Sequence, residues 1–331
     1  MRVAVLGAGA IGSYVGAALA RGGAEVALVA RGTQLAALRE HGVTVRSPRG
    51  DFHAALQATD DPAEIGPVDI VFLGLKAYSY ATAGPLLEPL LHDRTAVVAG
   101  QNGIPWWYFH RHGGPFDGRR IEAVDPGGAT SAAIDPARAM GCVVYCSTEL
   151  EAPGVVRHGE GTRFTLGEPD RTRSQRCLAF SEAMIAGGLK APVESDVREQ
   201  IWIKLLGNAI FNPLSVLTRA TLAAMCRDPG TRALARTGMQ ECIEIARALG
   251  SNPEVEIERR IDGAERVGDH RTSTLQDLEA GKRLELDALI VAVVELADLT
   301  GTPAPTLRAL SASSSLLAES LGLAGRSEAG R

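Results

Sequence analysis

The feature that most constrains the fold is a glycine-rich turn close to the start of the sequence. The stretch RVAVLG, residues 2–7, has the continuous apolar character of a strand that is buried on both faces. It runs into GAGAIG, residues 7–12, and a helix is expected over about residues 10–21. A G-x-G-x-x-G turn between a buried strand and a helix is typical of dinucleotide-binding units, whose turn and helix N-terminus hold the pyrophosphate. A glycine-rich turn without a ligand is the less favoured alternative.

The first half of the chain repeats this alternation of apolar runs and helical segments. Further buried strands are predicted at AEVALVAR (24–31), VDIVFLGLK (68–76) and TAVVAGQNG (95–103). Strand patterns stop after about residue 172, and helical patterns dominate from there. We therefore predict a Rossmann-type α/β domain and an all-helical C-terminal domain. The expected bounds are 1–190 for the NADP-binding domain, 191–320 for the helical substrate and catalytic domain, and 321–331 for a disordered tail.

The end of the second predicted strand indicates which dinucleotide binds. NAD sites usually place an acidic residue there for the ribose 2′-hydroxyl, but this strand ends in Arg31. A guanidinium can hold a 2′-phosphate with paired hydrogen bonds, so we predict NADP(H). The alternative is a solvated loop arginine. The residues of the turn expected to bind the cofactor are Gly7, Ala8, Gly9, Ala10, Ile11 and Gly12.

Two polar residues follow other predicted strands. Lys76 comes at the carboxyl end of one apolar run, and Asn102 follows the next in the sequence GQNG. Ligands of open α/β sheets bind beyond the carboxyl ends of the strands. Each residue alone is compatible with an ordinary loop, since Asn-Gly is a common turn. The two together favour a site.

A polar ridge interrupts the apolar segment IWIKLLGNAIFNPLSV, residues 201–216. Lys204, Asn208 and Asn212 are spaced four apart, and a step of four residues drifts only about 40° around a helix. The three side chains are therefore expected along one edge of a helix. Such an edge is compatible with packing as well as with chemistry.

A second charged residue, after Lys204, lies at an apolar position in the predicted helix over residues 272–296. Glu285 falls on its apolar stripe, where a carboxylate calls for a partner or a role. Ser273, near the start of this helix, is expected to cap it or to face a ligand. Lys204 and Glu285 together would place an ammonium group near a reacting carbonyl. An ion pair that only fixes the helix packing is an equal alternative.

The bulk composition excludes several other classes of protein. The net charge is −5 without a basic run, which argues against nucleic acid or an anionic membrane as partner. Five scattered cysteines without a C-x-x-C pair indicate reduced thiols and a cytoplasmic protein. No signal-peptide layout or membrane span is expected. His110 and His112 lack an acidic cluster nearby, so no metal is assigned.

These motifs together resemble those of the ketopantoate reductase family, the NADPH-dependent 2-dehydropantoate 2-reductases. The matching pieces are GAGAIG (7–12), Arg31, LKAYS (75–79), QNG (101–103), IWIKLLGNAIFNPLS (201–215) and TSTLQDLEAGKRLELDAL (272–289). They follow the family's order over nearly the whole chain. The resemblance implies an NADP-dependent oxidoreductase acting on CH–OH groups, which reduces 2-dehydropantoate to pantoate in pantothenate biosynthesis.

The same resemblance implies roles for the residues of the site. Lys204 would protonate the ketone oxygen, and Glu285 would orient Lys204 or bind the substrate hydroxyl. The substrate carboxylate and hydroxyl groups would be held by Asn102, Asn208, Asn212 and Ser273. Lys76 and Arg31 would serve the cofactor, and Asn102 is expected to contact the cofactor as well. A homodimer is also expected, although no sequence pattern requires it.

One segment departs from the family pattern. Residues 104–128 are rich in aromatic side chains, including Trp106, Trp107, Tyr108 and Phe109. They either reshape the substrate pocket, which would favour another 2-keto acid such as an aromatic one, or form a packed helix and a surface loop. A non-catalytic NADP(H)-binding protein is disfavoured because the lysine and the glutamate are both present. A 3-hydroxyacid or 6-phosphogluconate-type dehydrogenase is disfavoured by the Asn-Pro pair and the late Ser/Glu pair.

Overall fold

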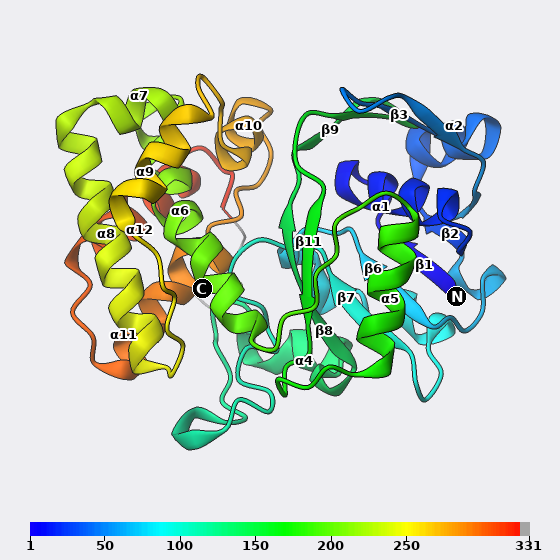
Figure 1. Ribbon diagram of the computed structural model, residues 1–331, viewed down its shortest axis with the longest axis horizontal. Helices are drawn as coiled ribbons and strands as arrows, with labels where there is room; N and C mark the ends of the chain where they lie inside the picture. Colours follow the sequence, from blue (N-terminus) through cyan, green and yellow to red (C-terminus); the bar gives the residue numbers. More distant parts are fainter. Residues whose placement is uncertain (325–331) are drawn as a thin grey trace. The chain divides into compact units, whose positions relative to one another are not determined.

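The computed structural model describes residues 1–324, which divide into two compact units (Figure 1). The first comprises Met1–Gln101, Trp106–Arg119 and Gly128–Val197, and the second comprises Asn102–Pro105, Arg120–Gly127 and the chain from Arg198 onward. The division after Val197 differs from the predicted boundary at residue 190. The segment around Lys190 and Val193 stays with the first unit because it forms parallel bridges with the last strand of the sheet.

The first unit is built on a seven-stranded sheet in the order β11-β8-β7-β6-β1-β2-β5. Its strands are β1 (Arg2–Leu6), β2 (Glu25–Val29), β5 (Gln57–Thr59), β6 (Ile70–Leu73), β7 (Ala96–Ala99), β8 (Ala139–Tyr145) and β11 (Arg163–Gly167). Neighbouring strands are parallel except β11, which runs antiparallel to β8. The chain continues from β5 to β6 on the other side of β1. The topological switch point, where such sheets bind ligands, therefore lies between β1 and β6.

Helices and a second small sheet cover the main sheet. The helices are α1 (Ala10–Arg21), α2 (Gly32–His41), α3 (Gly84–Leu87), α4 (Ala129–Ala133) and α5 (Gln175–Ala186). The four-stranded sheet has the order β4-β3-β10-β9, with β3 (Val43–Arg46), β4 (Phe52–Ala54), β9 (Thr148–Ala152) and β10 (Val155–His158). Both α1 and α5 contribute to one apolar core with the strands, in which α1 also contacts the smaller sheet. Burial of each leucine or phenylalanine side chain in this core contributes about 1.5–3 kcal/mol to the free energy of unfolding.

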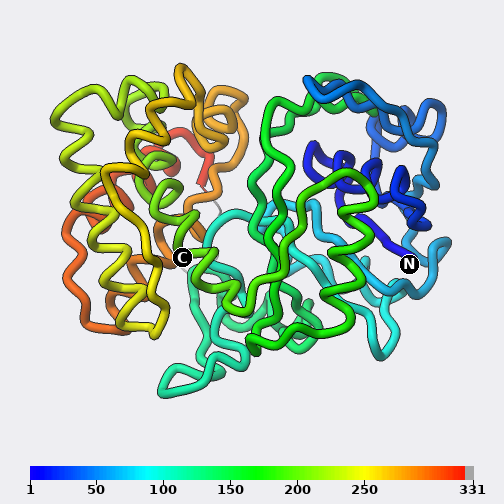
Figure 2. The backbone as a smooth tube through the Cα atoms, viewed as in Figure 1, coloured from blue at the N-terminus to red at the C-terminus, as the bar shows by residue number. Residues whose placement is uncertain are grey.

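The second unit is formed by helices, so the predicted fold class is confirmed. Its helices are α6 (Val197–Thr218), α7 (Leu222–Arg227), α8 (Pro229–Ala248), α9 (Ile257–Arg266), α10 (Ser273–Glu279), α11 (Ala292–Thr300) and α12 (Pro305–Ser320), with a π-helical turn at Asp287–Val291. Figure 2 shows α7, α8 and α9 packed side by side. In α6, 67% of the most apolar window is buried. Length and composition would allow α6 to cross a membrane, but a buried core helix has the same properties.

Helix α12 was not predicted from the sequence. Pro305 at its first turn and the buried Leu307 and Leu310 are signals that could have indicated it. The buried carboxylate of Glu241 accepts hydrogen bonds from the N–H groups of Thr306 and Leu307, at 3.0 and 2.9 Å. These bonds satisfy donors that a helix start leaves without partners.

The predicted tail starts too early. The amide of Leu323 donates to the Ala318 carbonyl at 2.8 Å, and the Leu323 carbonyl accepts from the Leu284 amide at 3.1 Å. Residues 321–324 are therefore held on the second unit by backbone hydrogen bonds. The rest of the predicted tail lies outside the described residues.

Candidate functional site

The glycine turn lies at the switch point of the main sheet. Gly7 has φ = +98°, and a Cβ added there would lie 2.7 Å from the Leu75 side chain. A Cβ on Gly12 would lie 2.1 Å from the Gly7 carbonyl oxygen, so the first turn of α1 packs directly on the loop. A Cβ on Gly9 would meet only the Gly74 carbonyl oxygen among the described residues, at 3.7 Å. The turn is therefore closed at its first and third glycines and open at its second, as the approach of a pyrophosphate requires.

The helix start beside Gly9 suits an anion. Gly9 is the N-cap of α1 and offers no side chain to its free N–H groups, which therefore remain donors for a ligand. The loop is held in shape by its neighbours. The Ala8 carbonyl accepts from Ser13 Oγ at 3.0 Å and from Gln34 Nε2 at 2.8 Å, and Gln34 Oε1 accepts from the Gly154 amide at 3.0 Å. Sequence reasoning missed Ser13 in α1 and Gln34 in α2, because no motif marks a side chain that holds a loop through a backbone carbonyl.

Arg31 and Lys76 lie beyond the carboxyl ends of β2 and β6, the two strands that flank β1. Arg31 is exposed, and its guanidinium makes no hydrogen bond or ion pair with residues 1–324. Lys76 is half-buried at the start of the 3₁₀ turn Ala77–Thr82. Two cations on either side of a pyrophosphate-type turn form a donor set that fits the phosphates of NADP(H).

The polar ridge lies on α6 in the second unit. Lys204 and Asn208 are half-buried, and Asn212 is 5% exposed. The Lys204 ammonium donates a hydrogen bond to Asn102 Oδ1. Because an ammonium can only donate, Asn102 must present its oxygen to Lys204 and turn its Nδ2 elsewhere. That Nδ2 has no partner among the described residues, so the pair offers a charged and a neutral donor to an oxygen that gains negative charge.

The start of α10 is tied to α6 beside this ridge. Thr272, not Ser273, is the N-cap, and its Oγ1 accepts from the Leu275 amide at 3.2 Å. The same Oγ1 lies 2.6 Å from Ser215 Oγ, three residues after Asn212. The capping role predicted for Ser273 is therefore wrong, and its side chain is exposed at the first position of the helix.

Glu285 does not lie on the helical stripe predicted for residues 272–296. Helix α10 ends six residues before it, and Gly281 has φ = +63°, which breaks the helical path. The next helical turn, Asp287–Val291, begins two residues after Glu285. Between these turns burial alternates, with Leu284 and Leu286 buried and Glu285 half-buried, as in an extended segment. The apolar spacing therefore predicted correctly which residues are buried, but these residues lie in an extended segment rather than in the predicted helix.

The aromatic segment is buried in the first unit. Trp106, Trp107, Tyr108 and Phe109 are each at most 4% exposed. The Trp106 indole donates to the Ile134 carbonyl at 3.0 Å, which satisfies its one donor. The packing interpretation is therefore correct for these side chains, although they lie in turns rather than in the predicted helix. The alternative, that the segment reshapes the substrate pocket, stays a prediction.

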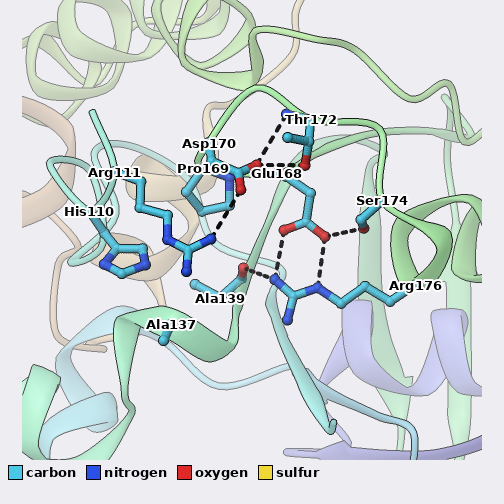
Figure 3. Close-up of a pocket in the computed structure, with 10 residues that line it drawn as sticks. All are labelled: His110, Arg111, Ala137, Ala139, Glu168, Pro169, Asp170, Thr172, Ser174 and Arg176. Carbon is cyan, nitrogen blue, oxygen red and sulfur yellow. Dashed lines mark hydrogen bonds and ion pairs between the residues drawn. The ribbon is translucent and has the colours of Figure 1, made fainter. Parts of the chain in front are cut away.

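A pocket of about 280 Å³ lies elsewhere in the first unit, and Figure 3 shows its lining. Glu168 accepts two hydrogen bonds from Arg176 at 2.7 Å each, and Arg111 pairs with Asp170 at 3.1 Å. Hydrogen bonding to Glu168 raises the pKa of Arg176 above its usual value. These charges satisfy one another and fix the start of α5, and no predicted site residue lines the pocket. Among residues 1–324 there is also no group of three or more histidine, cysteine, aspartate or glutamate residues placed to hold a metal.

Comparison with known proteins gives matches over most of the chain. The family model for ketopantoate reductase PanE/ApbA matches residues 3–106, and that for its C-terminal domain matches residues 196–317. A 2-dehydropantoate 2-reductase of Mesorhizobium japonicum is 49% identical over 94% of this chain and 95% of its own length. The crystal structure of a candidate ketopantoate reductase from Ralstonia solanacearum MolK2 superposes with a TM-score of 0.90 at 36% identity, covering 97% of this chain and 99% of that one. A D-mandelate dehydrogenase with NADH and anilino(oxo)acetate shares the fold, with a TM-score of 0.80 at 19% identity over 98% of this chain and 100% of that one.

Proposed function

Because this chain belongs to the ketopantoate reductase family, we propose that it reduces 2-dehydropantoate to pantoate with NADPH. The observation that carries the proposal is the hydrogen bond between the Lys204 ammonium and Asn102 Oδ1. It joins a proton donor to an amide whose Nδ2 is available for a substrate. The glycine turn and Arg31 supply the cofactor side of the same proposal.

The reaction needs a hydride at the carbonyl carbon and a proton at the carbonyl oxygen. Bound NADPH supplies the hydride. Lys204 stabilises the negative charge that develops on the oxygen and donates the proton, while Asn102 Nδ2 hydrogen-bonds the same oxygen. The substrate carboxylate and hydroxyl are assigned to Asn208, Asn212 and Ser273. Glu285 is assigned to orient Lys204 or to bind the hydroxyl.

The proposed substrate is tested by following NADPH oxidation with three 2-keto acids in parallel. Ketopantoate carries a hydroxymethyl group, 2-oxoisovalerate lacks it, and phenylglyoxylate replaces the branched chain by a ring. We expect the highest kcat/KM with ketopantoate, because polar side chains on α6 and α10 are available to bind its hydroxyl. Turnover of phenylglyoxylate without turnover of ketopantoate would assign the chain to the second candidate, a reductase of another 2-keto acid.

Replacing Arg31 with alanine is expected to raise the Kd for NADPH about 10–100-fold and to leave the Kd for NADH unchanged. The guanidinium is exposed and without a partner in residues 1–324, so its removal costs only the charge-assisted bonds to the 2′-phosphate. Both constants can be measured by isothermal titration calorimetry. Arg94→Ala, at another exposed arginine of the same unit, is the control. A wild-type protein that binds NADH tenfold better than NADPH would refute this role of Arg31.

The five cysteines are free thiols, and four of them are buried. Burial raises the pKa of Cys177 to about 12 and that of Cys226 to about 11, so these thiols stay protonated and unreactive at neutral pH. Free thiols support the proposal of a cytoplasmic protein. The homodimer remains a prediction.

A further inference from the structure

The proposed proton donor depends on a short segment that follows β7. Residues 102–105 form part of the second unit, although the strand before them belongs to the first. Gly103 has φ = +91°, and a Cβ added there would lie 2.2 Å from the Ala288 carbonyl oxygen. The Ile104 amide donates to the same carbonyl at 2.8 Å. The backbone next to Asn102 therefore rests directly on Ala288.

Ala288 lies in the π-helical turn Asp287–Val291. There the Val291 amide bonds the Leu286 carbonyl five residues earlier, at 3.2 Å. Such turns interrupt α-helices mostly as single insertions, frequently at functional sites. A carbonyl oxygen has two lone pairs, so the Ala288 oxygen can accept from Ile104 outside its own helix.

A second anchor lies further along this helical segment. Glu295, seven residues after Ala288, lies in α11, which follows the π-helical turn directly. Its carboxylate accepts from the amides of Glu122 and Ala123, at 2.7 and 2.8 Å. Both pieces of the chain that join the second unit before residue 198 are thus hydrogen-bonded to the segment formed by the π-helical turn and α11.

We propose that the π-helical turn is a positioning element for proton donation, with Gly103 and Ala288 as its positioning residues. Contact between Gly103 and Ala288 fixes the backbone of Asn102, and Asn102 Oδ1 in turn fixes the Lys204 ammonium. This inference rests on the proposed function, because it assigns the ammonium the role of proton donor. The family motifs do not imply this dependence, in which the Ala288 carbonyl determines the position of the Lys204 ammonium.

The test is Gly103→Ala, with Gly268→Ala as matched control. Gly268 lies in the same unit at φ = +84°, but a Cβ there meets nothing within 4 Å. Both glycines have a positive φ that strains an alanine, and only Gly103→Ala also pushes against Ala288. We expect Gly103→Ala to lower kcat about 10–100-fold with an unchanged Kd for NADPH, since a shift of about 1 Å costs that much. Gly268→Ala should keep the wild-type kcat. A kcat of Gly103→Ala equal to that of Gly268→Ala would overturn the proposal.

A double-mutant cycle shows whether Gly103 acts through Asn102. In the Asn102→Ala background, Gly103→Ala should lower kcat by less than about twofold, because the link is already lost. Independent, additive losses would contradict the proposed chain of contacts. If Gly103→Ala does not fold, Ala288→Val presses on the same contact from the other side, and the same expectations apply to it.

Reactivity of the lysine gives a readout that needs no turnover. Reductive methylation followed by mass spectrometry measures the rate at Lys204, with the exposed Lys282 as internal reference. Gly103→Ala and Asn102→Ala should each raise the Lys204 rate about tenfold, since the ammonium loses its hydrogen bond. An unchanged rate in Gly103→Ala would overturn the positioning role. A wild-type protein that reduces no 2-keto acid would overturn the proposed function, while this rate comparison would still decide whether Gly103 positions Lys204.

Discussion

Replacement of Lys204 with alanine is expected to lower kcat for ketopantoate reduction about 10²–10⁴-fold, the usual contribution of a general acid. The Kd for NADPH should not change, because the glycine turn and Arg31 are the residues proposed to bind the phosphates of NADPH, while Lys204 is proposed to act on the substrate. Asn102 alone would remain to stabilise the alkoxide, as a neutral donor without a proton to give. Steady-state kinetics and calorimetric titration with NADPH measure the two quantities separately.

Two controls decide whether the lower kcat of Lys204→Ala comes from loss of the proton donor or from a general disturbance of the structure. Lys282→Ala removes an exposed lysine from the same unit and should keep the wild-type kcat. Added primary alkylamines should partly restore turnover of Lys204→Ala, because they can enter the space left by the side chain and supply a proton. They should not restore Gly12→Ala, where a Cβ would lie 2.1 Å from the Gly7 carbonyl oxygen and disrupt the turn. Wild-type turnover of Lys204→Ala would exclude Lys204 as the proton donor.

Local patterns predicted the parts of the site that lie within one element. The G-x-G-x-x-G spacing places Gly9 at a helix start, and a step of four residues places Lys204 and Asn208 on one edge of α6. Both follow from covalent geometry and helical period alone. The pairing of Lys204 with Asn102, 102 residues apart in the chain, has no such local signal.

The assignment of Glu285 to a helical stripe was wrong because a local pattern was extended across a change of backbone conformation. Apolar spacing predicts burial, but a left-handed glycine at residue 281 and an extended stretch up to the π-helical turn change the period without changing which residues are buried. The parallel pairing between two strands of the smaller sheet was also beyond local prediction. Val155 in β10 pairs in parallel with Thr44 in β3, and no local sequence pattern predicts pairing between segments so far apart in the chain.

Gly9→Asp is expected to abolish cofactor binding while making the free protein slightly more stable. A side chain at residue 9 has room, since within residues 1–324 its Cβ would meet only the Gly74 carbonyl oxygen, at 3.7 Å, and φ = −72° suits any residue. Aspartate is a preferred N-cap, and its charge favours the positive end of α1, which should add about 0.3–1 kcal/mol to the free energy of unfolding. The same carboxylate would occupy and repel the site of the pyrophosphate. We therefore expect the Kd for NADPH and for NADH to rise at least about 100-fold, because two like charges at about 4 Å repel by several kcal/mol near a protein surface.

The opposite signs of these two effects make the result specific. A variant that merely misfolds loses stability and binding together, whereas Gly9→Asp should melt at or above the wild-type temperature and still fail to bind. Gly9→Ala places a neutral methyl group in the same space and should weaken binding far less, which separates charge repulsion from steric exclusion. Arg31→Ala should affect NADPH alone, since NADH lacks the 2′-phosphate, whereas Gly9→Asp should affect both dinucleotides equally. Wild-type affinity of Gly9→Asp for NADPH would show that the dinucleotide does not bind at the glycine turn, because no pyrophosphate could approach Gly9 past that carboxylate.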